Sequence, residues 1–317
     1  MTAAMSFFGA CPGCDAPRDD SRILFEARSF GDPCHVLQCA QCTLIYKDRH
    51  PDAAAMAGTY GSSYVHFSAD ANAGVAEVNS ARQKLSRCLR LLGGPTKGSA
   101  ARILDIGCGA GEFVRIAAGL GFAAEGIDPN LPAALESPVL RRADPEILPA
   151  GGYDVVTLLN VAEHVTDPLR LFRASVRLLR PGGVMLVTCP FGGSWARRGY
   201  RQRWVHLALD EHLLFWTVKS LENCVARAGF SGRRSVRIGG SPFPYGFVDS
   251  TEPAGHAASA AAPRNPAPRA AHRLQGAAWR LARRVQASEF AGNAVRWLVD
   301  ASRLGDYLEY AVARGRE

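Results

Sequence analysis

Residues 105–111 combine an acidic side chain with three glycines at alternate positions, in the order Asp-Ile-Gly-Cys-Gly-Ala-Gly. A buried strand precedes them and a helix near 111–119 follows, so the glycines occupy a strand-to-helix turn. Glycine allows such a turn and lets a cofactor approach the backbone where a side chain would block it. A dinucleotide fingerprint beginning at Gly107 would need glycine or alanine in place of Glu112, so that interpretation is weak. The spacing predicts a different cofactor loop, and the alternative is a glycine-rich turn that binds nothing.

Two Cys-x2-Cys motifs near the N-terminus have the spacing of a metal site, and 24 residues separate them. Two intervening residues let both thiolates of a motif reach one tetrahedral ion at about 2.3 Å. Four thiolates close the coordination sphere, so we expect a structural Zn²⁺ in a zinc ribbon, with redox dithiols as the alternative. Cys34 and His35 rank below these four as ligands. The predicted zinc ligands are Cys11, Cys14, Cys39 and Cys42.

Histidines and carboxylates in the second half of the chain could move protons. Glu163 and His164 open the helix after one buried strand, and a second group, with two more histidines, follows the next strand. An oxygen or carbon nucleophile must lose a proton, and a positioned base typically adds about 10²–10⁴ in rate. The candidates for such a base are His164, His206 and His212.

Alternating strands and helices supply the scaffold for these groups. Buried strands alternate with helices near 111–119 and 169–179, the pattern of an α/β protein with a parallel sheet. Asp128 ends the second strand, where an acid in an α/β nucleotide fold binds ribose hydroxyls. A helix cap before Pro129 is the alternative for Asp128. The expected strands are 103–107, 123–128, 153–160, 184–189, 233–238 and 307–314.

Four motifs, DIGCGAGEF, GIDPN, YDVVTLLNVAEHVTDP and LLRPGGVMLVTCP, follow one another at regular spacing. Over residues 100–238 this succession resembles the class I S-adenosylmethionine (SAM) methyltransferases, above all the ubiquinone-biosynthesis-type O-methyltransferases. The resemblance implies an α/β, Rossmann-like seven-stranded sheet with helices on both faces and an antiparallel final strand. It also implies SAM as cofactor and S-adenosylhomocysteine as product.

The resemblance assigns a role to each cofactor-binding residue. Asn160 would line the pocket through its backbone at the carboxyl edge of the sheet, where open α/β sheets bind ligands. The remaining roles are Gly107, Gly109 and Gly111 on the methionine part of SAM, Asp105 near its amino group, Asp128 on the ribose, and Asp144 with Pro145 beside adenine.

The cysteine module followed by this domain also resembles a subgroup that includes deoxysugar C-methyltransferases. In those enzymes a Glu-His pair at the position of Glu211 and His212 takes part in catalysis, and a nearby Tyr precedes it. Here the residue two before Glu211 is Leu209, which departs from that pattern. On this resemblance we predict His212 as the general base, with Glu211 orienting it or the acceptor. His206 and His164 rank below His212, and the alternative is a segment that only fixes a loop. The expected organisation is a zinc ribbon over 1–50, a helical connector and cofactor cover over 51–98, a SAM-binding domain over 99–240, a Pro/Ala-rich linker with a basic helical insertion over 241–304, and the final strand over 305–317.

Charge is distributed unevenly along the chain. The net charge is +8, and residues 264–303 hold eight Arg against Glu289 and Asp300. Basic amphipathic helices over 272–303 would suit a membrane surface, a lid over the acceptor or a dimer contact. The alternatives are a solvated basic helix face and a helix that only packs in the core. The sequence leaves the oligomeric state open. With no apolar run near 20 residues and no signal peptide at the N-terminus, we expect a cytoplasmic protein.

These patterns predict SAM-dependent methyl transfer to a small-molecule acceptor, by O- or C-methylation of a sugar or hydroxylated natural-product intermediate. The first alternative is an RNA methyltransferase that uses the ribbon and the basic helix. Against it, the ribbon has few Lys or Arg and no row of stacking aromatics. The second alternative, a non-catalytic scaffold that binds SAM or a partner, predicts a degraded glycine motif, whereas this motif is intact.

Overall fold

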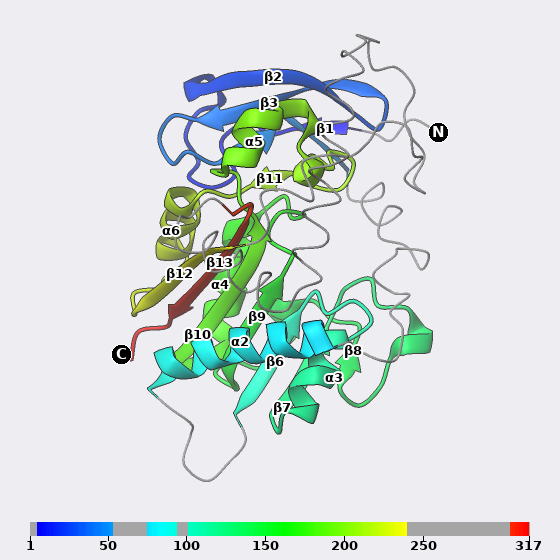
Figure 1. Cartoon of the computed structure of the whole chain (residues 1–317), viewed down its shortest axis with the longest axis vertical. Coiled ribbons are helices and arrows are strands. Elements are labelled where there is room, and N and C mark those ends of the chain that lie inside the picture. The colour runs from blue at the N-terminus through cyan, green and yellow to red at the C-terminus, as the bar shows by residue number, and fades with distance from the viewer. Residues whose placement is uncertain (1–4, 53–74, 94–100, 240–304, 317) are drawn as a thin grey trace, which may run out of the picture.

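The computed structural model describes residues 5–52, 75–93, 101–239 and 305–316 (Figure 1). The basic insertion and most of the predicted connector therefore lie outside the described residues. Within the described ranges, no helix combines the length and apolar character needed to span a membrane.

Seven strands form the central sheet in the order β12-β13-β10-β9-β6-β7-β8 (Figure 1). Five of them are parallel: β6 (Arg102–Ile106), β7 (Ala123–Ile127), β8 (Leu140–Arg141), β9 (Tyr153–Leu159) and β10 (Leu179–Pro190). The strand β13 (Tyr307–Ala313) runs antiparallel to both its neighbours, β10 and β12 (Arg234–Gly239). This arrangement confirms the Rossmann-like α/β sheet and its antiparallel final strand.

Helices cover both faces of the sheet because its central strands are apolar on both sides, as strands of parallel sheets are. On one face, α2 (Val75–Leu92) contacts β10 and β13, and α3 (Glu112–Gly119) contacts β7. On the other face, α4 (Pro168–Leu178) contacts β9, β10 and α6 (Val218–Arg227). The shorter elements are α5 (Trp195–Tyr200) and the 3-10 turns η1 (Arg18–Asp20), η3 (Ala133–Leu135), η4 (Pro145–Ile147), η5 (Arg201–Arg203) and η6 (Val205–Leu207).

The four predicted zinc ligands belong to a second, antiparallel sheet and the turns beside it, which together we call the cysteine module. Its order is β11-β4-β3-β2, with β2 (Ser21–Ser29), β3 (Asp32–Cys39), β4 (Ile45–Lys47) and β11 (Leu214–Phe215). Beside it, β1 (Met5–Phe7) pairs with β5 (Arg49–Pro51). The strand β11 follows β10 in the sequence, so a segment from the domain of the central sheet completes the cysteine module.

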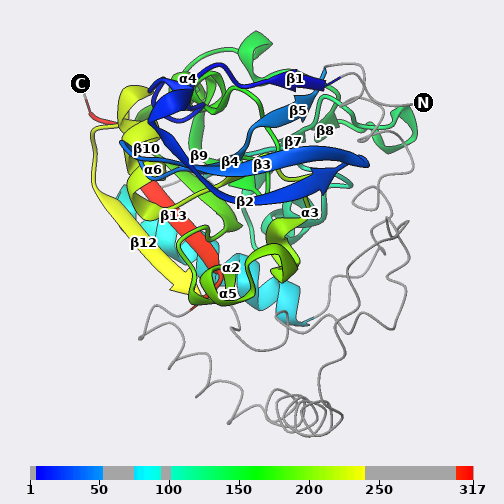
Figure 2. The same ribbon diagram turned by 90° about the horizontal axis from the view of Figure 1, so that it is seen from above.

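The cysteine module lies across one end of the central sheet (Figures 1 and 2). Contacts identify this end as the carboxyl ends of β9 and β10. The amides of Leu213 and Leu214 donate to the carbonyl of Glu163, just beyond β9, and the amide of Gly192, just beyond β10, donates to the carbonyl of Trp216. Ligands of open α/β sheets bind at this edge, so the module covers part of the expected binding region.

Candidate active site and cysteine cluster

The glycine loop between β6 and α3 is held in a conformation that excludes side chains. Gly107, Gly109 and Gly111 have φ values of +73°, +51° and +78°, in the left-handed region that glycine tolerates. A Cβ on Gly107 would lie 2.5 Å from Cγ2 of Val161, and one on Gly111 would lie 2.5 Å from Cδ1 of Leu140. The loop is therefore packed between Val161 and strand β8, and its backbone lies at the strand ends without side chains to cover it.

Two carboxylates adjoin this loop. Asp128, just after β7, accepts from the amide of Gly109 (3.2 Å) and from that of Asn130 (2.8 Å), and burial raises its pKa. Asp105 is buried and accepts a 2.6 Å hydrogen bond from the hydroxyl of Thr157. Burial raises the pKa of Asp105 to about 7, and the charge of Asp128 adds to that shift. The loop thus carries one carboxyl group close to its ionisation point at neutral pH.

Asp144 and Asn160 occupy local backbone features. Asp144 caps the turn η4, accepting from the amide of Glu146 (2.8 Å), and its other oxygen lies 3.7 Å from Arg170. The cap accounts for this side chain without a ligand. Asn160 has a φ of +56°, and its amide donates to the carbonyl of Thr188 (2.9 Å). Asparagine is one of the few residues that adopt this conformation readily. Their roles beside SAM remain predictions.

The predicted base segment contains an imidazole–carboxylate pair. Nε2 of His206 donates to Oδ2 of Asp306, 3.1 Å away, and Asp306 is 2% exposed. Nδ1 of His212 donates to the carbonyl oxygen of His206 (2.8 Å), so a backbone group orients this ring. Glu211 contributes its backbone carbonyl to Nδ1 of His164 (3.1 Å). The structure thus brings all three predicted residues of this segment close together.

Glu163 and His164 lie in a turn, which corrects the expectation that they open a helix. The helix α4 begins at Pro168 and is capped by Asp167, whose side chain accepts from the amide of Arg170 (2.9 Å). Proline is favoured at the first position of a helix, so Pro168 sets the start of α4 and residues 163 and 164 stay outside the helix. Ligand atoms of Glu163, His164 and His212 lie within 4.8 Å of one another.

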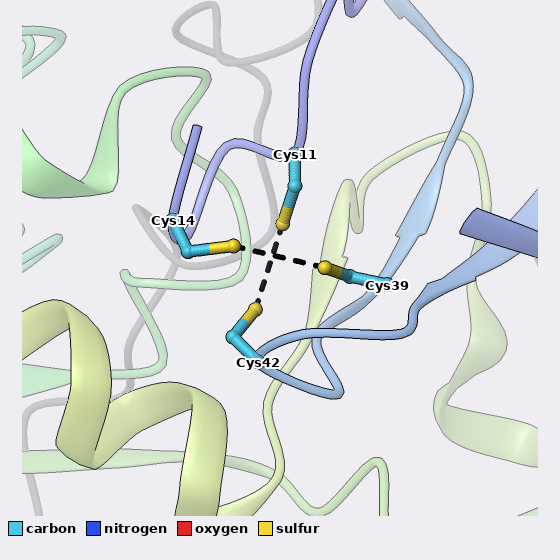
Figure 3. Close-up of side chains that lie close together, drawn as sticks. All are labelled: Cys11, Cys14, Cys39 and Cys42. Atoms are coloured by element: carbon cyan, nitrogen blue, oxygen red, sulfur yellow. Dashed lines mark hydrogen bonds between the residues drawn. The ribbon is translucent and has the colours of Figure 1, made fainter. Parts of the chain in front are cut away.

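The four predicted zinc ligands form one cluster (Figure 3). The sulfur atoms of Cys11 and Cys42 are 3.6 Å apart, as are those of Cys14 and Cys39. Thiolates around a tetrahedral zinc ion, at about 2.3 Å from it, lie about 3.8 Å from one another. All nine cysteines of the chain are free of disulfides. The donor set and its spacing therefore fit Zn²⁺. Cys34 and His35 lie outside this cluster, and His35 pairs with Asp48 (2.9 Å).

Sequence reasoning missed two residues of this region. Thr157, a polar residue inside the apolar strand YDVVTLL, was a visible signal, and its hydroxyl binds Asp105. Asp306 gave no local signal because it meets His206 across 100 residues.

Comparison with known proteins identifies the family. Residues 78–234 match a family described as "Methyltransferase domain". The ubiquinone biosynthesis O-methyltransferase of Dinoroseobacter shibae is 33% identical over 166 residues, which are 47% of this chain and 67% of that protein. The enzyme of the same name from Caulobacter sp. (strain K31) is 37% identical over 118 residues, 33% of this chain and 47% of its own length. The chain thus spans about half the length of some of the curated relatives it matches.

Among solved structures, phosphoethanolamine N-methyltransferase 2 of Haemonchus contortus, in complex with SAM, is 16% identical with a TM-score of 0.47. The match covers 92% of this chain and 71% of that chain. From the sequence relatives and the family match, the chain belongs to the class I SAM-dependent methyltransferases.

Proposed function

We propose that the protein transfers the methyl group of SAM to a hydroxylated small molecule, by O- or C-methylation of a sugar or natural-product intermediate. The observation that carries this proposal is the group of imidazoles at the carboxyl ends of β9 and β10. The turn with His164 follows Val161, which packs against Gly107 of the cofactor loop. The methyl acceptor would therefore bind between the glycine loop and the segment 206–212, whose imidazoles can accept its proton.

Methyl transfer from a sulfonium is an in-line substitution. Holding the acceptor close to the methyl carbon can contribute about 7–11 kcal/mol, provided that the geometry is fixed. A hydroxyl acceptor must also lose its proton, and an imidazole can take it near neutral pH. The sequence favours His212 for this step. His206 is the second choice, and its buried partner Asp306 would stabilise the imidazolium that forms.

We also propose a structural Zn²⁺ in the cysteine cluster. Cysteine binds zinc as the thiolate, so a cation that binds these four side chains displaces their protons. The cluster fixes the module, and β4 of the module pairs with β11 at Leu214 and Phe215. Zinc would in this way hold the segment that follows His212 over the sheet, without touching the reaction.

The test has two stages, of which the first is SAM binding to the zinc-loaded protein by calorimetry. The second uses SAM with a labelled methyl group and a panel of phenols, sugar nucleotides and RNA. We expect label in a hydroxylated small molecule. Replacement of either histidine, in His206→Gln and His212→Gln, should lower turnover by about 10²–10⁴ for the true base and leave SAM affinity unchanged.

Each outcome of this test is decisive. Absence of SAM binding by folded protein rules out the proposed function. Label in RNA, with binding that falls steeply as salt rises, would replace it by the nucleic-acid alternative. If neither histidine variant loses turnover, the base lies elsewhere.

A further inference from the structure

Glu163 is the least expected side chain near the acceptor region. It is 1% exposed, and neither of its carboxyl oxygens has a hydrogen-bond partner among the described residues. Buried polar atoms are normally satisfied, and a buried carboxyl group without partners is costly. Its place in the fold is nevertheless well fixed, because its backbone carbonyl accepts from the amides of Leu213 (2.8 Å) and Leu214 (3.0 Å). The carboxyl group is thus held in position for something that the described residues do not supply.

Two imidazoles lie beside this carboxyl group, and a backbone carbonyl holds each of them. The rings of His164 and His212 have centroids 4.8 Å apart. In each ring Nδ1 donates to a backbone carbonyl, that of Glu211 for His164 and that of His206 for His212. In the neutral imidazole, this hydrogen bond places the proton on Nδ1 and leaves the lone pair on Nε2 in both rings. Histidines that bind metals are commonly held in this way, because the backbone bond fixes both the tautomer and the ring orientation.

We propose that Glu163, His164 and His212 bind one divalent first-row transition-metal ion, at a site separate from the four cysteines. Their ligand atoms lie within 4.8 Å of one another, so small side-chain rotations bring them to bonding distance of about 2.0–2.2 Å. Two imidazoles with one carboxylate leave coordination positions open, unlike four thiolates. Such a site accepts an oxygen ligand from a substrate.

The place of the site suggests what the open positions do, and this part rests on the proposed function. Val161, two residues before Glu163, packs against Gly107 of the cofactor loop, so the cation lies near the methyl donor. A cation lowers the pKa of a bound hydroxyl and orients its oxygen. The oxygen lone pair forms the new O–C bond to the methyl group while the C–S bond breaks. The sulfur keeps that electron pair, and the acceptor proton passes to His206, since His212 is then a ligand.

The experiment counts metal ions in the full-length, tag-free chain. Protein stripped with a chelator is reloaded with Zn²⁺, dialysed, and assayed for bound metal by elemental analysis. We expect two equivalents in the unchanged chain and one in both Glu163→Gln and His212→Gln. The affinity for the second ion should fall by more than the roughly 10–100-fold that loss of an outer-shell partner costs. The matched control is His35→Gln, because His35 pairs with Asp48 in the module and should leave two equivalents.

Cobalt separates the two sites by their ligands. Co²⁺ in the cysteine cluster gives thiolate charge-transfer absorption, and Co²⁺ at Glu163 gives weaker bands without it. The weaker bands should disappear in His212→Gln while the thiolate bands remain. If Glu163→Gln does not fold, His212→Gln and His164→Gln provide the same test at partly exposed positions.

One equivalent of zinc in the unchanged chain, bound only by thiolates, overturns the cation site. So does a second equivalent that persists in Glu163→Gln and His212→Gln. SAM binding is measured on the same samples, so the two proposals fail separately. Two zinc equivalents without SAM binding keep the cation site and remove the proposed function, and SAM binding with one equivalent does the reverse.

Discussion

The glycine loop and the segment 204–217 lie at the same edge of the sheet, yet contacts of very different range hold them. Hydrogen bonds from the loop backbone go to residues of the next strand and the turn after it, such as the bond from Gly109 to Asp128, 19 residues later. The segment is fixed by residues far away, since Thr217 bonds to Thr43, 174 residues earlier. The methyl donor can therefore be inferred from one stretch of sequence. The segment 204–217, which we call the acceptor side because the proposed acceptor would bind there, depends on how the whole chain folds.

The acceptor side also shares its packing with the cysteine module. Leu44 and Tyr46 of the module lie in one buried cluster with Leu213 and Trp216. The indole of Trp216 donates to the carbonyl of Ala162 (3.0 Å), directly before Glu163. Disturbance of the module should therefore reach the acceptor side sooner than the glycine loop.

Loss of the cysteine cluster should have the largest effect, and it should affect the acceptor side more than the glycine loop. Cys39→Ser with Cys42→Ser would remove the proposed zinc site, whose binding would contribute about 10–16 kcal/mol to folding of the module. We expect loss of one zinc equivalent, a much lower melting temperature and loss of methyl transfer, with SAM affinity reduced less than about tenfold. Elemental analysis, thermal unfolding and calorimetry check this. The control is Cys34→Ser: Cys34 is buried but lies outside the cluster, so this variant should keep the zinc of the cluster. Equal losses of SAM affinity and methyl transfer would contradict the separation of the two regions.

Substitution of a loop glycine should have the opposite pattern. In Gly107→Ala the new Cβ would lie 2.5 Å from Val161, and the left-handed conformation adds about 1–2 kcal/mol of strain. We expect SAM affinity to fall by more than tenfold while the zinc content of the cluster is unchanged. Gly119→Ala is the control, since nothing lies within 4 Å of a Cβ there. Similar SAM affinity in both variants would show that the loop does not bind the cofactor.

The pH dependence of SAM binding sharpens the description of the loop. The pKa of Asp105 is about 7, so its carboxyl group ionises as pH rises through neutrality. An ionised group attracts the amino group of SAM, so affinity should rise between about pH 6 and 8. In Asp105→Asn that rise should disappear, as measured by calorimetry at several pH values. A slope that survives the substitution would assign it to another group.

The same shift predicts how stability changes without SAM. The folded pKa of Asp105 lies above its unfolded value of about 3.9, so its contribution is fully present at low pH. It is lost as pH rises through about 7. Relative to Asp105→Asn, the free energy of unfolding should therefore decline by a few kcal/mol from pH 4 to 7. Urea unfolding at a series of pH values measures this, and a constant difference would contradict the raised pKa.

The smallest effect concerns the link between module and acceptor side. The hydroxyls of Thr43 and Thr217 are 2.7 Å apart, and Thr217 also caps α6 through the amide of Ser220. Thr217→Val should cost about 1 kcal/mol from the cap alone. A double-mutant cycle with Thr43→Val isolates the pair, for which we expect a coupling of about 0.5–1.5 kcal/mol. Additive effects on unfolding would mean that this contact does not join the two regions.

The sequence predicted the parts of the molecule whose signals are local. The central strands other than the two-residue β8, the helices α3 and α4, and the antiparallel closing strand were predicted, and the paired cysteine motifs did form one cluster. The helix near 169–179 was predicted to within one residue of α4, but the expectation that Glu163 and His164 open that helix was wrong, because its cap is Asp167. The strand β11 was not predicted, since two residues, Leu214 and Phe215, carry no strand pattern of their own.

By itself, the sequence determined the family, the methyl donor and the four-cysteine cluster, because each depends on residue types at fixed short spacings. Such spacings act through local geometry, as in a glycine turn or a Cys-x2-Cys knuckle. Only the tertiary structure decided that Asp306 meets His206 and that Glu163 lies beside two imidazoles. These meetings depend on the burial of one shared core by distant segments, and no short stretch of sequence records which surfaces will pack together.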